Sequence, residues 1–164
     1  MYRPDISVSW NDRLIHFDPG RDFAVMDYTV GFHARRTGWN WSAAGGHATD
    51  GTPVAINFAM DIDQGTNTVP VYWIGGDIYR IQQVTFDYDI ADPMKPWRIY
   101  SPDTSVDLTF QPLGMREGKM GIGILMYDLK QPFGFYNGTI KAEDGKTYTI
   151  VNMVGIAEKH VALW

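Results

Sequence analysis

Residues 53–63, Pro-Val-Ala-Ile-Asn-Phe-Ala-Met-Asp-Ile-Asp, decide the fold class of this chain. Every second position carries a large apolar side chain, and these are Val54, Ile56, Phe58, Met60 and Ile62. The positions between them hold small or polar side chains. Because successive side chains of a β-strand point to opposite faces, this period of two predicts a strand with one buried face.

The same alternation recurs further along the chain. In residues 84–90 and 106–110, apolar side chains alternate with Asp and Thr, which predicts two more half-buried strands. Residues 121–127 and 148–154 carry apolar side chains on both faces, which predicts strands that are covered on both sides. No segment shows a sustained helical stripe of apolar residues, and the best candidate for a short helix is residues 22–30.

Turn signals and composition agree with an all-β chain. Asp50-Gly51, Gly75-Gly76-Asp77 and Asp144-Gly145 are hairpin sequences, and the 164 residues include 17 Gly, 9 Pro and 14% aromatic side chains. About 8–10 strands in one domain predict an antiparallel sandwich or barrel. The long runs 77–89 and 119–127 favour the barrel, and residues 1–164 are predicted to form a single domain.

Charge and cysteine content exclude several classes of protein. The net charge of −5 and the pI near 5.2 argue against a nucleic-acid partner, because phosphate binding needs a basic face. There is no cysteine for disulfides or thiolate chemistry. The sequence shows neither a membrane-spanning apolar run nor a signal peptide, so we expect a cytoplasmic protein.

Established catalytic and cofactor motifs are missing from the sequence, and we expect no cofactor. The four histidines, His16, His33, His47 and His160, are too dispersed to predict a metal site. The pairs Asp61/Asp63 and Asp87/Asp89 each share a strand face and could hold a cation or exchange protons. Exposed acids are the more common explanation for such pairs.

Residues 32–42 form the densest group of candidate ligand-binding side chains. Trp39 and Trp41 share one strand face, and Arg36 could stack on such rings or bind an anionic group. A core Trp pair with an Arg at its edge would explain the same pattern.

Two later segments carry further candidates. Gln131 and Tyr136 are polar handles among aromatic residues, which is typical of a small-molecule pocket. Glu158 and His160 lie on one face of an extended C-terminal segment and could transfer protons, with His33 as a third candidate. A salt-bridged pair that closes the sheet is the structural alternative.

The ordered motifs resemble a known bacterial family. Arg-Thr-x-Trp-x-Trp at residues 36–41, Ala-Ile-Asn at 55–57 and Pro-Trp-Arg-Ile at 96–99 resemble the second half of the DUF2804 family, a domain of unknown function. Leu-Thr-Phe-Gln-Pro at 108–112, Gln-Pro-Phe-Gly-x-Tyr-x-Gly at 131–138 and the ending Gly-Ile-x-Glu-x-His-x-Ala-x-Trp at 155–164 continue the resemblance.

This resemblance implies a lipocalin-like (calycin-type) β-barrel related to the AttH-like proteins and carotenoid hydratases. It implies an apolar ligand more weakly. Either the chain is part of a longer protein and a second barrel domain is its partner, or it is a single-barrel relative.

Three functions follow as hypotheses. The chain binds a hydrophobic or amphipathic small molecule in its barrel; it is a structural half of a two-barrel protein with a filled core; or it is a hydratase or isomerase that uses Glu158 and His160. The residues expected to line the ligand site are Arg36, Trp39, Trp41, Asn57, Gln131 and Tyr136.

Overall fold

The structure is a computed structural model that describes residues 5–28, 34–61 and 70–164. Its contacts group into two compact units, Met1–Val30 and Gly31–Trp164. The described residues contain strands and no helix, and therefore no helix that could cross a membrane. The strands are β1 (Ser7–Trp10), β2 (Arg13–His16), β3 (Arg36–His47), β4 (Pro53–Asp61), β5 (Val71–Ile74), β6 (Asp77–Arg80), β7 (Thr85–Asp87), β8 (Trp97–Tyr100), β9 (Val106–Ile122), β10 (Leu125–Lys141) and β11 (Thr147–Leu163).

The first unit is built on one hairpin, β1–β2. Its two-residue turn, Asn11-Asp12, has positive φ at both positions, 47° and 60°, as a type I′ turn requires. The helix predicted at residues 22–30 is wrong for residues 22–28, which form no helix, and residues 29–30 lie outside the described residues. Within that stretch the Asp22 carboxylate bonds the Asp18 amide and the Arg21 side chain instead.

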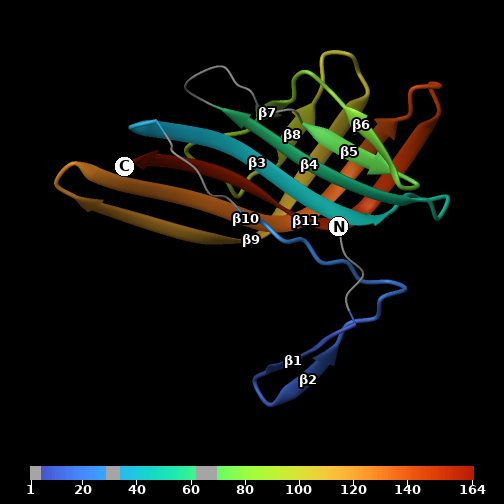
Figure 1. Cartoon of the computed structure of the whole chain (residues 1–164), viewed down its shortest axis with the longest axis horizontal. Coiled ribbons are helices and arrows are strands. Elements are labelled where there is room, and N and C mark those ends of the chain that lie inside the picture. Colours follow the sequence, from blue (N-terminus) through green and yellow to red (C-terminus); the bar gives the residue numbers. More distant parts are fainter. Residues whose placement is uncertain (1–4, 29–33, 62–69) are drawn as a thin grey trace. The chain divides into compact units, whose positions relative to one another are not determined.

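The second unit is one antiparallel sheet of nine strands in the order β6-β5-β4-β3-β11-β10-β9-β8-β7. Apart from β6 and β7, strands of this sheet that follow one another in sequence are neighbours, and the pairing of β3 with β11 joins the two halves. This is the meander of an up-and-down barrel, open between β6 and β7 among the described residues. The sheet curls around a core as a half-barrel (Figure 1), which confirms the predicted barrel class.

The long strands are not those that the apolar runs indicated. The run at 77–89 is broken between β6 and β7, and the run at 119–127 contains the hairpin turn between β9 and β10. Gly123 makes that turn with φ +58°. Instead, β9, β10 and β11 each span 17 residues and carry the curvature of the barrel.

The predicted turns at Gly51, Gly75-Gly76 and Gly145 are confirmed. All four glycines have positive φ, between 62° and 109°, which a residue with a side chain rarely adopts. Each of these turns joins consecutive antiparallel strands or supports the loop between them.

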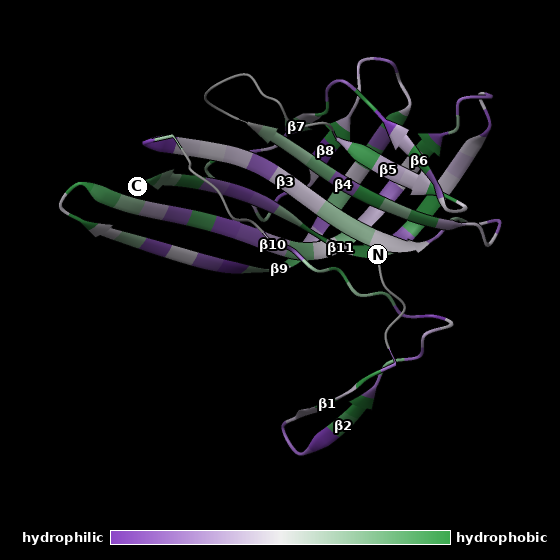
Figure 2. Ribbon diagram, in the orientation of Figure 1, coloured by the Kyte–Doolittle hydropathy of each residue, from purple (hydrophilic) through white to green (hydrophobic). Residues whose placement is uncertain are grey.

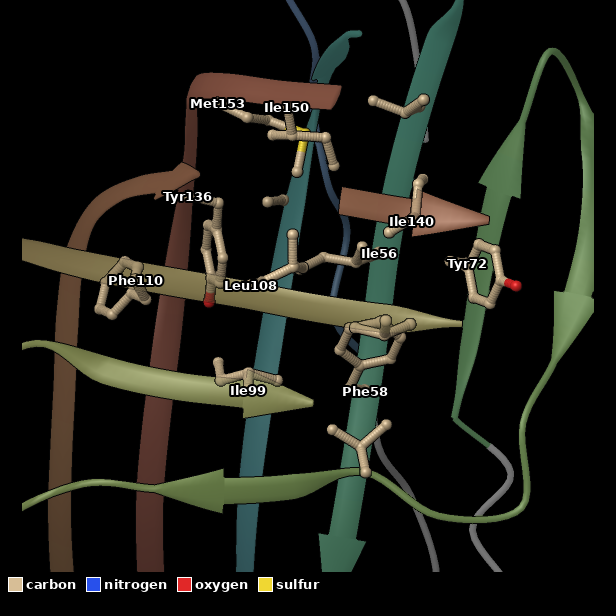
Figure 3. Close-up of a cluster of buried hydrophobic side chains, with 14 of the residues drawn as sticks. Ile56, Phe58, Tyr72, Ile99, Leu108, Phe110, Tyr136, Ile140, Ile150 and Met153 are labelled. Carbon is tan, nitrogen blue, oxygen red and sulfur yellow. The ribbon is translucent and has the colours of Figure 1, made fainter. Parts of the chain in front are cut away.

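Large apolar side chains fill the inside of the curled sheet. Ile56 and Phe58 from β4 meet Tyr72 from β5, while Leu108 and Tyr136 come from the other half of the sheet (Figure 3). The Tyr72 hydroxyl donates to the Lys141 carbonyl at 2.6 Å, so it links β5 to β10, which are not neighbours in the sheet order.

Each of the central strands β3, β11 and β10 therefore has an inner face, which carries the core, and an outer face. Ala44, Ala157 and Tyr136 mark the inner face of these strands, and residues at odd separations from them lie on the outer face. Hydropathy alternates along β9 and β10 (Figure 2). Polar residues are found on both faces beyond the core.

Gly155 lies where β3 and β11 approach each other closely. A Cβ at this position would lie 2.5 Å from the Ala43 carbonyl oxygen and 2.8 Å from the Tyr136 ring. We expect Gly155→Ala to lower the free energy of unfolding by about 1–3 kcal/mol, because a packed sheet must shift to admit the methyl group. Chemical denaturation measures the effect.

Gly121→Ala is the matched control, since its Cβ would meet only the Leu125 carbonyl at 3.8 Å. It should change the unfolding free energy by no more than about 0.5 kcal/mol. Equal effects at the two glycines would contradict the close packing described at Gly155.

Candidate functional site

Strand register brings the main candidate residues together on the outer face. Trp39 on β3 lies opposite His160 on β11, and Trp41 lies opposite Glu158. Across the next ladder, Leu129 on β10 lies opposite His160. Residues that are far apart in the sequence thus form one cluster on the face opposite the core.

Glu158 is the polar centre of this cluster. Its side chain is 9% exposed, and both carboxylate oxygens accept hydrogen bonds. The Trp39 indole Nε1 donates to Oε1 at 2.8 Å, and the Gln131 amide Nε2 donates to Oε2 at 2.6 Å. Three strands therefore hold the carboxylate, and two N–H donors satisfy a buried acid that forms no ion pair with a described lysine or arginine.

His160 lies beside the carboxylate between two aromatic rings. Its ring centroid is 4.1 Å from that of Trp39 and 4.9 Å from that of Tyr127, which meets it edge to face. The Nδ1 atom is 3.9 Å from Glu158 Oε1, which is too long for a hydrogen bond. The Nε2 atom is buried and has no hydrogen-bond partner in the described part of the chain.

Burial lowers the pKa of His160 below its ordinary value of 6.5. The negative charges of Glu158 and Asp128 act in the opposite direction, but desolvation is the larger effect. The imidazole is therefore neutral at pH 7. A neutral imidazole carries one N–H and one acceptor nitrogen, and the cluster provides no partner for Nε2.

A second Trp–amide pair continues the cluster onto β4. The Trp41 indole Nε1 donates to Asn57 Oδ1 at 2.8 Å. Both Trp rings of β3 are half-buried and both indole nitrogens are hydrogen-bonded, so the outer face presents their ring surfaces rather than free polar groups.

The other predicted site residues lie elsewhere. Tyr136 belongs to the core, where its hydroxyl donates to the Ile156 carbonyl at 2.7 Å and burial raises its pKa. Arg36 opens β3 on the same side as the inner-face residues. His33 lies outside the described residues.

Sequence reasoning missed Tyr127 and Leu129, which complete the surroundings of His160. Leu129 is buried opposite it, and the Tyr127 ring occupies the space that a side chain at Gly118 would take. Both residues share a strand face with Gln131, so the period of two along residues 125–131 is the signal that could have found them.

Of the two acidic pairs, the structure describes the side chains of Asp87 and Asp89 only. Lys95 Nζ bonds Asp89 Oδ2 at 2.6 Å on an exposed surface, and the side chains of Asp61 and Asp63 lie outside the described residues. Groups of three or more potential metal ligands are absent from the part of the chain that the structure covers.

The chain is thus an all-β protein with a curled antiparallel meander sheet, and a buried Glu–His cluster lies on the outer face of that sheet. The family described as "Domain of unknown function (DUF2804)" matches residues 5–164, and the chain belongs to this family. Comparison with curated proteins and with solved structures gives no match.

The lowered pKa of His160 predicts a pH-dependent stability. As the pH falls from 7 to 5, the unfolded chain takes up a proton near pH 6.5 that the folded chain resists, so the folded state loses stability. His160→Gln should flatten this dependence by up to about 1.4 kcal/mol per pH unit, as measured by denaturation at several pH values. A His160→Gln variant that keeps the wild-type pH dependence would contradict the assignment of this effect to His160.

Removal of one donor to Glu158 tests the hydrogen-bonded cluster. We expect Gln131→Ala to lower the unfolding free energy by about 1–3 kcal/mol, because a buried carboxylate oxygen loses its partner. Gln111→Ala, on an exposed position of β9, should change it by no more than about 0.5 kcal/mol. A loss at Gln131 no larger than that at Gln111 would show that the 2.6 Å contact contributes nothing to stability.

Proposed function

We propose that this chain is a binding domain for a hydrophobic or amphipathic small molecule, whose polar end is bound at His160 and Glu158. Both residues lie on the outer face of the sheet. Fold alone does not assign a function, so the proposal rests on the chemistry of this cluster.

Aromatic side chains fill part of the interior of the half-barrel, which favours the outer cluster as the ligand site. Trp97, Phe110 and Tyr136 pack ring against ring inside the half-barrel, with centroid separations of 6.3 Å and 4.7 Å. Tyr88 stacks on Trp97 at 3.7 Å. Side chains of the domain itself therefore occupy this part of the interior.

The surroundings of the cluster suit an apolar molecule. The half-buried rings of Trp39, Trp41 and Tyr127 lie around the carboxylate and the imidazole, and Phe133, which shares a face with Gln131, is 50% exposed. Small-molecule sites typically combine aromatic walls with a few fixed polar groups.

The observation that carries the proposal is the unpartnered Nε2 of His160. A buried polar atom without a hydrogen bond costs free energy, and such atoms are rare unless a function needs them. With its proton on Nδ1, which faces Glu158, the imidazole offers Nε2 as an acceptor for a ligand hydroxyl. The Tyr127 ring packs against the imidazole with a centroid separation of 4.9 Å, and we propose that this ring moves when a ligand reaches Nε2.

Native mass spectrometry of freshly purified protein and thermal stabilisation by 1-decanol test the proposal. We expect a retained apolar molecule, or a rise in melting temperature with 1-decanol, since a ligand that binds only the folded state stabilises it. His160→Phe keeps a ring between Trp39 and Tyr127 but removes both nitrogens, and should weaken decanol binding about tenfold or more.

His47→Phe, on an exposed strand end, is the matched control and should bind decanol like the wild type. Absence of both a retained species and a decanol shift would refute the binding function. Equal decanol affinity in the wild type and His160→Phe would place the ligand away from this cluster.

A second candidate is proton transfer of the hydratase or isomerase kind. It is favoured by the neutral imidazole of His160 within 3.9 Å of the Glu158 carboxylate, because neighbouring groups of this type can exchange a proton with a substrate. In that case Glu158→Gln would abolish turnover while ligand binding persists.

We also propose a partner domain and a location for this chain. Exposed Leu113, Phe133 and Val154 on β9–β11 would suit packing against a second barrel domain. The net charge of −5 and the lack of cysteine favour a cytoplasmic protein without a nucleic-acid partner. The lipocalin-like ancestry implied by the sequence resemblance supports an apolar ligand.

A further inference from the structure

Two lysines face each other on the inner face of the sheet, where the core ends. Lys130 on β10 and Lys159 on β11 are directly paired across the ladder, and both are half-buried. Lys130 shares its face with the core residue Tyr136, and Lys159 shares its face with Ala157. The pair therefore lies on the side of the sheet opposite the Glu158–His160 cluster.

Like charges directly opposite each other in an antiparallel pair repel, since their Cβ atoms are only about 5 Å apart. Neither ammonium group makes an ion pair or a hydrogen bond to any residue that the structure describes. Two half-buried, paired positive charges that form no ion pair are an unusual arrangement in a chain whose net charge is −5.

Further hydrogen-bond donors lie beside this pair. Asn40 on β3 is directly opposite Lys159, and its Oδ1 accepts a bond from the Tyr88 hydroxyl at 2.9 Å. The Asn40 amide nitrogen is thereby left to donate elsewhere. Ser42, two residues along the same face, is fully buried beside the Tyr136 hydroxyl and marks the point where the core begins.

Apolar side chains continue the same face on either side of the donors. Pro132 and Phe58 are buried toward the core, and Val161 is half-buried toward the end of β11. A group with several acceptor oxygens would meet the two lysines and Asn40 together, and an attached apolar chain would contact the half-buried Val161.

We propose that Lys130 and Lys159 bind the oxyanion head group, a carboxylate or a phosphate, of a small amphipathic molecule on the inner face of the sheet. The site is distinct from the outer cluster, and it stands whether or not that cluster binds a ligand. Glu117, opposite Lys130, and Asp128, opposite Lys119, are the carboxylates that could compete for the lysines.

Titration calorimetry with decanoate, decyl phosphate and neutral 1-decanol tests the site at low salt. We expect the full chain to bind at least one of the two anions, and the Lys130→Gln/Lys159→Gln double variant to bind it about tenfold or more weakly. Decanol binding should be unchanged in the double variant. Decanoate alone, decyl phosphate alone, or both as ligands would identify which oxyanion the site accepts.

Lys119→Gln is the matched control, because Lys119 lies on the same face but opposite Asp128. It should keep the affinity for the anion within about twofold. Failure of the wild type to bind either anion, undiminished binding by the double variant, or an equal loss in Lys119→Gln would overturn the proposal.

The melting temperature without any probe gives a second, independent readout. Removal of the like-charge pair should raise the melting temperature of the double variant at low salt, and added salt should shrink the difference because it screens the repulsion. A lower melting temperature in the double variant would show that Glu117 or Asp128 already neutralises the lysines, which would also overturn the proposal.

Discussion

The pairing of β3 with β11 is the constraint on which the rest of the domain depends. These are the first and last strands of the sheet in chain order, and they pair over nine residue pairs, from Arg36–Leu163 to Ala44–Gly155. Side chains alternate between faces along both strands, so a slip of one residue would exchange inner and outer faces. The core and both candidate sites exist only in this register.

The register explains why one set of strands carries two kinds of chemistry. On the inner face, Ala157 and Ala44 are small enough for large rings from other strands to pack over them. On the outer face, the adjacent Glu158 and His160 are held by Trp39 and by β10. Beyond the core, the inner face itself becomes polar at Lys159. Because both faces of these strands make specific contacts, neither face is uniformly polar, and the simple alternation of apolar and polar residues is lost.

Much of the fold could be predicted from the sequence, but the barrel was predicted partly from the wrong strands. Residues 53–61 form the expected strand β4, and the glycine turns lie where they were expected. The apolar run at 121–127 conceals a hairpin turn at Gly123, because Ile and Leu are tolerated at an exposed hairpin end where burial does not select against them. Local periodicity cannot reveal such a break.

The candidate site was predictable only in part, for a related reason. The i, i+2 spacing placed Glu158 with His160 and Trp39 with Trp41 on common faces. It could not show that these faces meet, since that depends on long-range register. Nor could it tell that Tyr136 points into the core while Gln131, five residues earlier, points to the outer face. Residues an odd number of positions apart in a strand lie on opposite faces, but the sequence does not show which of the two faces packs on the core.

The most direct test of the outer cluster is the nitrogen-15 chemical shifts of the His160 imidazole, measured by NMR at pH 7 with and without 1-decanol. We predict a neutral ring with its proton on Nδ1 and an Nε2 resonance that moves when decanol is added, as expected for an acceptor that gains a hydrogen bond. A protonated ring, or an Nε2 resonance that stays unchanged while decanol binds, would contradict the assignment of this cluster as the ligand site.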